Sequence, residues 1–314
     1  MVFNLEYLKK DGSERKKILF TGLDYAGKSS IILSFRREIE KIAVAKPTLG
    51  AERRNFEFMG KEISEWDLGG QEYYRISYLK NPSRYFDKTE IAIYVIDIQN
   101  PDRFSEALSY LSDVVKQFKK LKIEPPIYVW FHKVDPDIYK HPDPQLVKAA
   151  TNLKNKIEKE IKYKKINYFK TTIFDLSTII NAMSKIFQSL FTKAEFVDQA
   201  AEEFAKKFNA EAVELIDDNS LIIGSYYKNS EVEDILKQST PYFLTLNDRL
   251  DTAQVKDDNP EDVMMVRRLG KNFLFKRFLI ENSPPYYLLM IKDDPTFSRE
   301  ELDVFINLLN EILF

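Results

Sequence analysis

The sequence predicts an α/β protein in which a mostly parallel central sheet is followed by a smaller α+β domain. Three observations support this fold class. Apolar strand patterns alternate with amphipathic helical patterns over the first part of the chain, and a glycine-rich turn lies between the first strand and the first helix. A second series of strands joined by short turns then follows. The length of 314 residues also favours two domains. We expect an N-terminal arm at 1–15, a first domain at 16–192 and a second at 193–314.

The composition narrows the classes of protein to consider. Hydrophobic residues make up 44% of the chain, which is enough to fill globular cores. The net charge of −2 gives no overall attraction to nucleic acid or to an anionic membrane. The absence of cysteine excludes disulfides and thiolate metal sites, and two histidines disfavour a His-based metal site. Without a long apolar run or a signal-peptide core, we expect a cytoplasmic protein that reaches a membrane only through partners.

The first strand, Lys16–Thr21, leads into the glycine-rich turn. The turn reads Gly-Leu-Asp-Tyr-Ala-Gly-Lys-Ser-Ser, and the spacing Gly-x-x-x-x-Gly-Lys-Ser is typical of a phosphate-binding loop, or P-loop. Its glycines let backbone N–H groups approach phosphates closely at the start of a helix. Lys28 is expected to reach the β- and γ-phosphates, and the Ser29 hydroxyl to bind Mg²⁺. The candidate nucleotide-binding residues of the loop are Gly22, Asp24, Ala26, Gly27, Lys28, Ser29 and Ser30.

A helix after the P-loop is predicted to run to about Ala43, because apolar residues recur there at helical spacing. We expect its polar face, which carries Arg36, Arg37, Glu38, Glu40 and Lys41, to be solvated. A short strand, Arg54–Phe58, and a turn then lead to the strand Ile63–Trp66.

Two further loops carry candidate residues. Thr48 follows a proline in the first loop, where its hydroxyl can bind Mg²⁺ and its N–H a γ-phosphate. Asp67 ends a strand expected to lie beside the first one, so its carboxylate can also hold Mg²⁺. The N–H of Gly70 can approach a γ-phosphate, and Gln71 can orient an attacking water. The predicted catalytic residues are therefore Lys28, Thr48 and Gln71, and the predicted metal ligands are Ser29, Thr48 and Asp67.

The next segments complete the alternating pattern. All candidate motifs fall at the carboxyl ends of predicted strands, which is where ligands bind in open α/β sheets. The predicted strands are Glu90–Ile98, Pro126–Phe131 and Asn167–Lys170, and the predicted helices are Pro101–Leu121, Asp143–Lys165 and Asp175–Phe191.

The segment after the strand Pro126–Phe131 reads His132-Lys133-Val134-Asp135. The carboxylate of Asp135 can accept hydrogen bonds from the ring N1–H and the amino group of guanine, a pair of donors that adenine lacks. The stem of Lys133 can pack along the base. In a later loop, the N–H of Ile173, next to Thr172, could bind the guanine O6.

These motifs resemble the small GTPase superfamily over about the first 190 residues. The segments GLDYAGKSS, PTLG and WDLGGQE are similar to those of Arf-like proteins. HKVD is similar to the HKxD form of the Rag/Gtr GTPases, and TTIFD resembles the Rag pattern, with Thr172 and Ile173 in place of a Ser-Ala pair. Arf and Ras relatives have asparagine where this chain has His132. The side-chain amide of that asparagine ties the base-binding loop to the P-loop in those relatives. The resemblance implies a P-loop NTPase fold of the G-domain type that binds GTP or GDP with Mg²⁺.

The second part predicts the element order helix, two strands, helix, three strands, helix. This order resembles the roadblock (longin-like) domain of the Rag/Gtr family, which implies a homo- or heterodimer through 193–314; an unrelated α+β domain is the alternative. Pro241 is expected to interrupt or kink the middle helix, and Ser298 with Glu301 to cap the last one. The elements are Ala194–Phe208, Ala212–Ile216, Leu221–Tyr227, Glu231–Leu246, Asp262–Leu269, Asn272–Glu281, Tyr286–Lys292 and a helix to Phe314.

The leading hypothesis is a Rag-like guanine nucleotide switch that hydrolyses GTP slowly and works with activating and exchange proteins. An Arf-like trafficking GTPase with an unrelated tail is one alternative. A nucleotide-bound interaction scaffold with negligible turnover is another. An adenine nucleotide enzyme is the weakest, because Asp135 would have no role in it.

Overall fold

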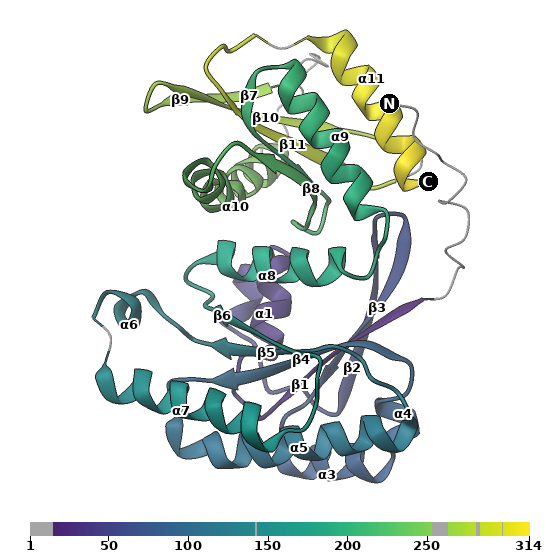
Figure 1. Ribbon diagram of the computed structural model, residues 1–314, viewed down its shortest axis with the longest axis vertical. Helices are drawn as coiled ribbons and strands as arrows, with labels where there is room; N and C mark the ends of the chain where they lie inside the picture. Colours follow the sequence, from purple (N-terminus) through teal and green to yellow (C-terminus); the bar gives the residue numbers. More distant parts are fainter. Residues whose placement is uncertain (1–14, 142, 253–262, 281–282, 297) are drawn as a thin grey trace. The chain divides into compact units, whose positions relative to one another are not determined.

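The computed structural model describes residues 15–141, 143–252, 263–280, 283–296 and 298–314. These residues form two compact units, each described by itself below (Figure 1). We call them the N-terminal unit, with residues 15–57 and Lys61–Ile179, and the C-terminal unit, with Phe58–Gly60 and Ile180–Phe314. The predicted arm lies outside the described residues except for Arg15, and the predicted boundary after residue 192 stays a prediction.

The N-terminal unit is built on a six-stranded sheet with the strand order β2-β3-β1-β4-β5-β6. Strand β1 is central and pairs in parallel with β3 and β4, and β5 and β6 continue the parallel arrangement. Strands β1, β4 and β5 are rich in aliphatic and aromatic residues because the centre of a parallel sheet is covered on both faces. The predicted strands are confirmed, with small differences at their ends. Their bounds are β1 (Lys16–Gly22), β2 (Ala51–Phe58), β3 (Lys61–Leu68), β4 (Thr89–Asp97), β5 (Ile127–His132) and β6 (Ile166–Thr171).

Helices cover both faces of this sheet, with α3, α5 and α7 on one face and α1 on the other (Figure 1). Helix α5 shows why they form: its apolar residues recur every three to four positions and are buried, while its lysines face outward. The helices are α1 (Lys28–Phe35), α2 (Ile39–Ile42), α3 (Glu72–Lys80), α4 (Pro82–Tyr85), a 3₁₀ turn (Pro101–Arg103) before α5 (Phe104–Leu121), α6 (Pro136–Lys140) and α7 (Pro144–Glu160). Helix α8 (Leu176–Gln188) begins in this unit, and its residues from Ile180 onward belong to the C-terminal unit.

The prediction of one continuous helix after the P-loop is wrong. Helix α1 ends at Phe35, and Arg37 adopts a left-handed conformation with φ of 58°. The N–H of Glu38 then bonds to the carbonyl of Leu33 at 2.9 Å, and the N–H of Arg37 to that of Ser34 at 3.1 Å. This pair of bonds is the Schellman arrangement that ends helices. The chain resumes helical structure only as the short α2.

The prediction that Arg36 lies on a solvated face is also wrong. Its guanidinium bonds to the carboxylate of Glu65 in β3 at 3.3 Å, and Glu65 is only 2% exposed. Burial raises the pKa of Glu65 to about 7, although the charge of Arg36 opposes that increase. The end of α1 is therefore anchored to β3.

Three helices were not predicted, and one predicted helix is too long. No clear apolar stripe marks α3 and α4 in the sequence, since α3 buries only Arg75 and Tyr78 and α4 buries none of its side chains. Helix α6 is a short turn that begins at Pro136. The charged helix predicted to reach Lys165 ends at Glu160, because Ile161 turns into extended backbone there.

The C-terminal unit has the predicted element order. Its five-stranded antiparallel sheet has the order β8-β7-β11-β10-β9, with α9 and α11 on one face and α10 on the other (Figure 1). Phe204 of α9 stacks on Phe305 of α11 with the ring centroids 4.1 Å apart. The roadblock resemblance of this unit stays a prediction. The elements are α9 (Ala194–Lys207), β7 (Ala210–Ile216), β8 (Ile222–Tyr227), α10 (Ser230–Thr252), β9 (Val263–Arg268), β10 (Lys271–Phe278), β11 (Tyr286–Lys292) and α11 (Arg299–Leu313).

Two local predictions in this unit need correction. Helix α10 continues through Pro241, so the helix is not interrupted there, and the kink stays a prediction. Ser298 occupies the N-cap position of α11, but its side chain makes no capping hydrogen bond. The predicted strand ends at Asp262 and Glu281 lie outside the described residues. Among the residues that the structure describes, no helix is long and apolar enough to cross a membrane.

Candidate functional site

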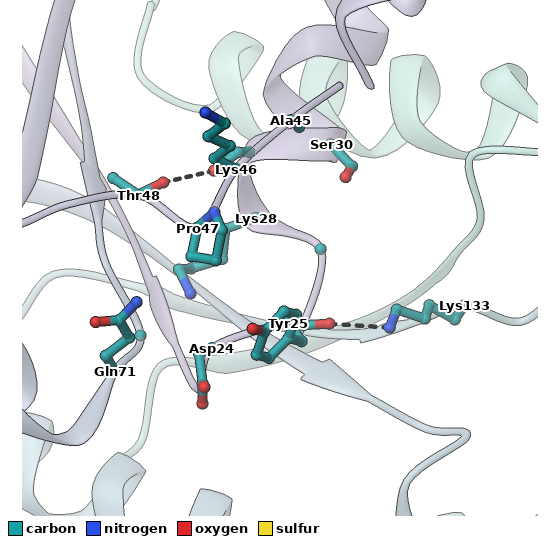
Figure 2. Close-up of a pocket in the computed structure, with 13 residues that line it drawn as sticks. Asp24, Tyr25, Lys28, Ser30, Ala45, Lys46, Pro47, Thr48, Gln71 and Lys133 are labelled. Carbon is teal, nitrogen blue, oxygen red and sulfur yellow. Dashed lines mark hydrogen bonds between the residues drawn. The ribbon is translucent and has the colours of Figure 1, made fainter. Parts of the chain in front are cut away.

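The P-loop after β1, the loop before β2 and the loops after β3 and β5 surround a pocket of about 200 Å³ in the N-terminal unit (Figure 2). The pocket lies at the carboxyl ends of parallel strands, where the sequence placed the candidate motifs. Most predicted phosphate-contacting residues line it. Its walls are Asp24, Tyr25, Gly27, Lys28, Ser29, Ser30, Ala45, Lys46, Pro47, Thr48, Gly70, Gln71 and Lys133.

The glycines of the site are required by close approaches of the backbone. Gly27 has φ of 97°, and a Cβ there would stand 2.4 Å from Cδ2 of His132. A Cβ on Gly70 would stand 2.1 Å from the backbone N of Asp24. Gly22, at the end of β1, lies against the backbone of Val95 in β4. The P-loop is therefore packed directly against both the β3 loop and the β5 loop.

Lys28 occupies the centre of the loop and is only 5% exposed. Its ammonium group donates hydrogen bonds to the carbonyls of Leu23 at 2.8 Å and Gly22 at 3.2 Å. Burial lowers the pKa of Lys28 to about 8, while the nearby carboxylates of Asp67 and Asp24 act to raise it. Lys28 is thus a buried cation that lines the pocket.

Three oxygen-bearing side chains from three separate elements meet beside Lys28. The Ser29 hydroxyl lies 2.8 Å from that of Thr48 and donates to Oδ2 of Asp67 at 2.5 Å; the Thr48 hydroxyl donates to the same oxygen at 3.1 Å. Asp67 is placed by the pairing of β3 with Phe20 of β1. Its other oxygen, Oδ1, is buried and has no hydrogen-bond partner among the described residues.

This cluster fits a magnesium ion, which prefers oxygen ligands and commonly uses one or two protein groups together with phosphate. The orphaned Oδ1 of Asp67 supports that fit, because a buried carboxylate oxygen normally has a partner. Within the described parts of the chain, no group of three or more His, Asp or Glu side chains is placed to hold a metal ion.

The segment after β5 forms the far side of the pocket. Lys133 donates to the carbonyl of Tyr25 at 2.9 Å (Figure 2). It also donates to Asp97 at 2.6 Å. Asp135 accepts a hydrogen bond on Oδ1 from the Thr172 hydroxyl at 2.6 Å. The structure thus brings the loop of Thr172 and Ile173 next to Asp135, as the sequence suggested.

His132 ends β5 and is 1% exposed. Its Nδ1 lies 2.9 Å from the hydroxyl of Thr171, and the ring edge packs on Gly27. Burial lowers the pKa of His132 to about 4, and the charge of Lys133 acts in the same direction. A neutral imidazole therefore connects the β5 loop with the P-loop, in the position where an amide was expected.

Sequence analysis missed two residues at the end of β4. Gln99 donates from Nε2 to Asp135 Oδ2 at 2.7 Å and to the carbonyl of Lys133 at 2.9 Å. Arg103 bonds to Asp24 through both its carboxylate and its carbonyl. Their position in the sequence was the one available indication, because β4 was the only predicted central strand whose carboxyl end had no motif assigned to it.

Similarity to known proteins extends over most of the chain. A family model described as the Gtr1/RagA G protein conserved region matches residues 17–244. The chain is 25% identical over 300 residues to Ras-related GTP-binding protein A of Dictyostelium discoideum, covering 90% of this chain and 91% of that protein.

Two other relatives match a shorter stretch. ADP-ribosylation factor-like protein 3 of Chlamydomonas reinhardtii is 35% identical over 127 residues, and ADP-ribosylation factor F of Dictyostelium discoideum 26% over 125. Each match covers 40% of this chain and somewhat less than two thirds of the relative, at 66% and 63%. The solved Arl6 BBS3 small GTPase of Trypanosoma brucei, with bound nucleotide analogue GppNp, matches 56% of this chain and 97% of its own at 16% identity and a TM-score of 0.45.

Proposed function

The chain belongs to the Gtr1/RagA G protein family, and from that premise we propose that it is a guanine nucleotide-binding molecular switch that hydrolyses GTP. One observation carries the proposal: Ser29, Thr48 and Asp67 converge beside the buried ammonium of Lys28. The match extends past residue 192, whereas the relatives named as ADP-ribosylation factors cover only 40% of the chain. We therefore favour the Rag-like hypothesis over an Arf-like trafficking role.

The P-loop would bind the phosphates. Lys28 would exchange its two carbonyl contacts for β- and γ-phosphate oxygens, which also favour its charged form. Ser29, Thr48 and Asp67 would hold Mg²⁺, which when bound offsets the negative charge of the phosphates. Gly22, Ala26, Gly27 and Ser30 would complete the loop around them.

Asp135 would select guanine by accepting hydrogen bonds from the base N1–H and amino group. The structure favours this role because Gln99 and Thr172 hold the carboxylate from two sides. Lys133 would pack along the base, Ile173 would donate its N–H to O6, and His132 would tie this loop to the P-loop.

Gln71 would orient the attacking water, and the loops of Thr48 and Gly70 would be released after hydrolysis. Turnover without a helper is expected to be slow, of order 10⁻⁴ to 10⁻² per second, so activating and exchange proteins are implied. We further propose a homo- or heterodimer through 193–314, and a cytoplasmic protein recruited to membranes by its partners. The Dictyostelium relative supports a role that involves both units, because its match covers 90% of the chain.

Equilibrium binding of GDP, GTP, ATP and XDP in the presence of Mg²⁺ tests the assignment. The parent protein should prefer guanine, and Asp135→Asn should shift the preference toward xanthine, because an amide can donate to the extra carbonyl of that base. Asp137→Asn, at an exposed position two residues away, is the matched control and should keep the guanine preference. If the parent protein does not distinguish guanine from adenine, the assignment of Asp135 is wrong.

A further inference from the structure

Four charged side chains of alternating sign connect the P-loop with α3. Arg103 donates from Nη2 to Asp24 Oδ1 at 2.7 Å and from Nη1 to the Asp24 carbonyl at 3.1 Å. Its Nε donates to Glu106 Oε2 at 3.1 Å, and Glu106 Oε1 accepts a hydrogen bond from Nη2 of Arg75. We call Asp24, Arg103, Glu106 and Arg75 the charged network.

Arg75 is the most buried member, at 8% exposure. Its guanidinium lies over the ring of Tyr110, 5.1 Å from the centroid, and its Nε has no partner among the described residues. Removing the partner of a buried charge is strongly unfavourable, because the charge is left without compensation. Glu106 is the carboxylate that pairs with Arg75, so the position of Arg75 depends on Glu106.

Helix α3 buries only two side chains, and Tyr74 and Leu79 also pack, partly buried, against the core. Of its nine residues, all of them described, only Arg75 and Tyr78 are buried. The Tyr78 hydroxyl donates to the carbonyl of Gly50, just after the Thr48 loop, at 2.6 Å. Gln71 is the N-cap of the helix, and the Arg75 N–H bonds to its carbonyl at 3.0 Å. Contacts that hold Arg75 in position therefore also help to position the first turn of α3 and the backbone of Gln71.

The other end of the network lies at the phosphate pocket, because Asp24 lines it. Without a positively charged partner, the Asp24 carboxylate would repel the phosphates of the nucleotide that this pocket is proposed to bind. Arg103 offsets this charge and is held in turn by Glu106. Burial acts to raise the pKa of Glu106, but the hydrogen bonds and charges of Arg103 and Arg75 lower it overall, which favours an ionised group. A substitution at Asp24 is therefore expected to alter the position or stability of Arg75, and a substitution at Arg75 to alter Asp24.

We propose that the charged network couples the P-loop to α3, and that Arg103, Glu106 and Arg75 are positioning residues for Gln71. The catalytic part of this inference rests on the proposed function, because only a bound nucleotide gives Gln71 a substrate. The coupling itself is a property of the protein and can be measured without nucleotide.

A mutant cycle tests the catalytic part. The variants Asp24→Asn and Arg75→Met, alone and together, are compared in single-turnover GTP hydrolysis, with Glu106 intact and in a Glu106→Gln background. No hydrogen bond or ion pair between Asp24 and Arg75 themselves is seen in the described structure, so the charged network joins them through Arg103 and Glu106. The Glu106→Gln background separates this route from the direct backbone contact between Asp24 and Gly70. The effects of the two substitutions should deviate from additivity by roughly threefold or more when Glu106 is intact, and should become additive in Glu106→Gln.

Amide hydrogen exchange of the segment 71–80 without added nucleotide tests the coupling directly. Asp24→Asn and Glu106→Gln should each raise exchange in this segment by roughly threefold or more. Asp113→Asn is the matched control, because it removes a carboxylate from the Asp113–Lys116 surface pair on the same helix α5. Its exchange in 71–80 should equal that of the parent protein.

The outcomes separate the two proposals. A parent protein that binds no guanine nucleotide overturns the proposed function, while the exchange experiment still decides the coupling. If exchange in 71–80 is the same in the parent protein and in Asp24→Asn, the network does not couple the two elements. Additive effects with Glu106 intact would overturn the catalytic part even where exchange responds.

Discussion

Replacing His132 by asparagine should make the protein less sensitive to acid. The imidazole is buried between the Thr171 hydroxyl and Gly27, where a charged ring would lose its hydration. Its pKa is accordingly lowered from 6.5 to about 4. An asparagine at this position would keep a polar side chain there but could not take up a proton.

The sign and size of the effect follow from the two pKa values. In the unfolded chain the imidazole binds a proton near pH 6.5, whereas in the folded protein it does so only near pH 4. Between these values the unfolded state binds more protons, so the free energy of unfolding falls as the pH falls from 6.5 towards 4. The gap corresponds to about 3 kcal/mol, all of which is retained above pH 6.5.

Urea unfolding at several values between about pH 7.5 and about pH 4.5 measures this contribution. The fluorescence of Trp66 and Trp130 reports the transition, since both lie in the N-terminal unit. The free energy of unfolding of His132→Asn minus that of the parent protein should rise by about 2 to 3 kcal/mol over this range on acidification. His141→Asn removes the other histidine from an exposed position and should follow the parent protein. Parallel curves for His132→Asn and the parent protein would refute the argument.

Three further predictions concern the pocket. Gly27→Ala should weaken GDP binding by about tenfold or more, because its Cβ would collide with His132. Gly270→Ala, also at a positive φ but with no atom within 4 Å of the added Cβ, should leave the affinity unchanged. The ratio of the GDP release rate after adding EDTA to the rate in Mg²⁺ should be at least about tenfold smaller in Asp67→Asn than in the parent protein. An unchanged ratio would show that Asp67 does not hold the metal ion. Gln71→Leu should slow single-turnover GTP hydrolysis by on the order of ten- to hundredfold without altering GDP affinity, and an unchanged rate would favour the scaffold alternative.

The placement of the pocket residues could be predicted because it follows from strand ends. Asp67 lies at the carboxyl end of β3 and Asp135 follows the apolar strand β5, and parallel strands carry such residues to one edge. The closeness of Ser29 and Asp67 therefore follows from two neighbouring strand ends, whereas Thr48 reaches them from the loop before β2. Their roles toward nucleotide and metal stay predictions.

The rest could not be predicted, for reasons that lie in long-range contacts. Arg75 and Glu106 look like charges on a solvated helix, and only the fold shows that they pair across 31 positions of sequence. Arg37 ends α1 in a left-handed conformation for which an arginine side chain has no special preference. Likewise, the sequence did not indicate that Gln99 bonds to Asp135, because a single glutamine after a strand can make many different contacts.

The parallel order of the N-terminal sheet also bears on how the chain matures during translation. Strand β1 emerges first with Ile18, Leu19 and Phe20, yet its two neighbours, β3 and β4, are completed only at Leu68 and Asp97. At about 5 to 20 residues per second, the ribosome leaves this apolar strand without its partners for several seconds. The loop of Thr172, which we propose to contact the base, arrives later still, since Thr172 follows β6. A nascent chain therefore exposes the apolar strand β1 and the P-loop sequence before the rest of the sheet is made, and chaperone binding to β1 would be most useful in that interval.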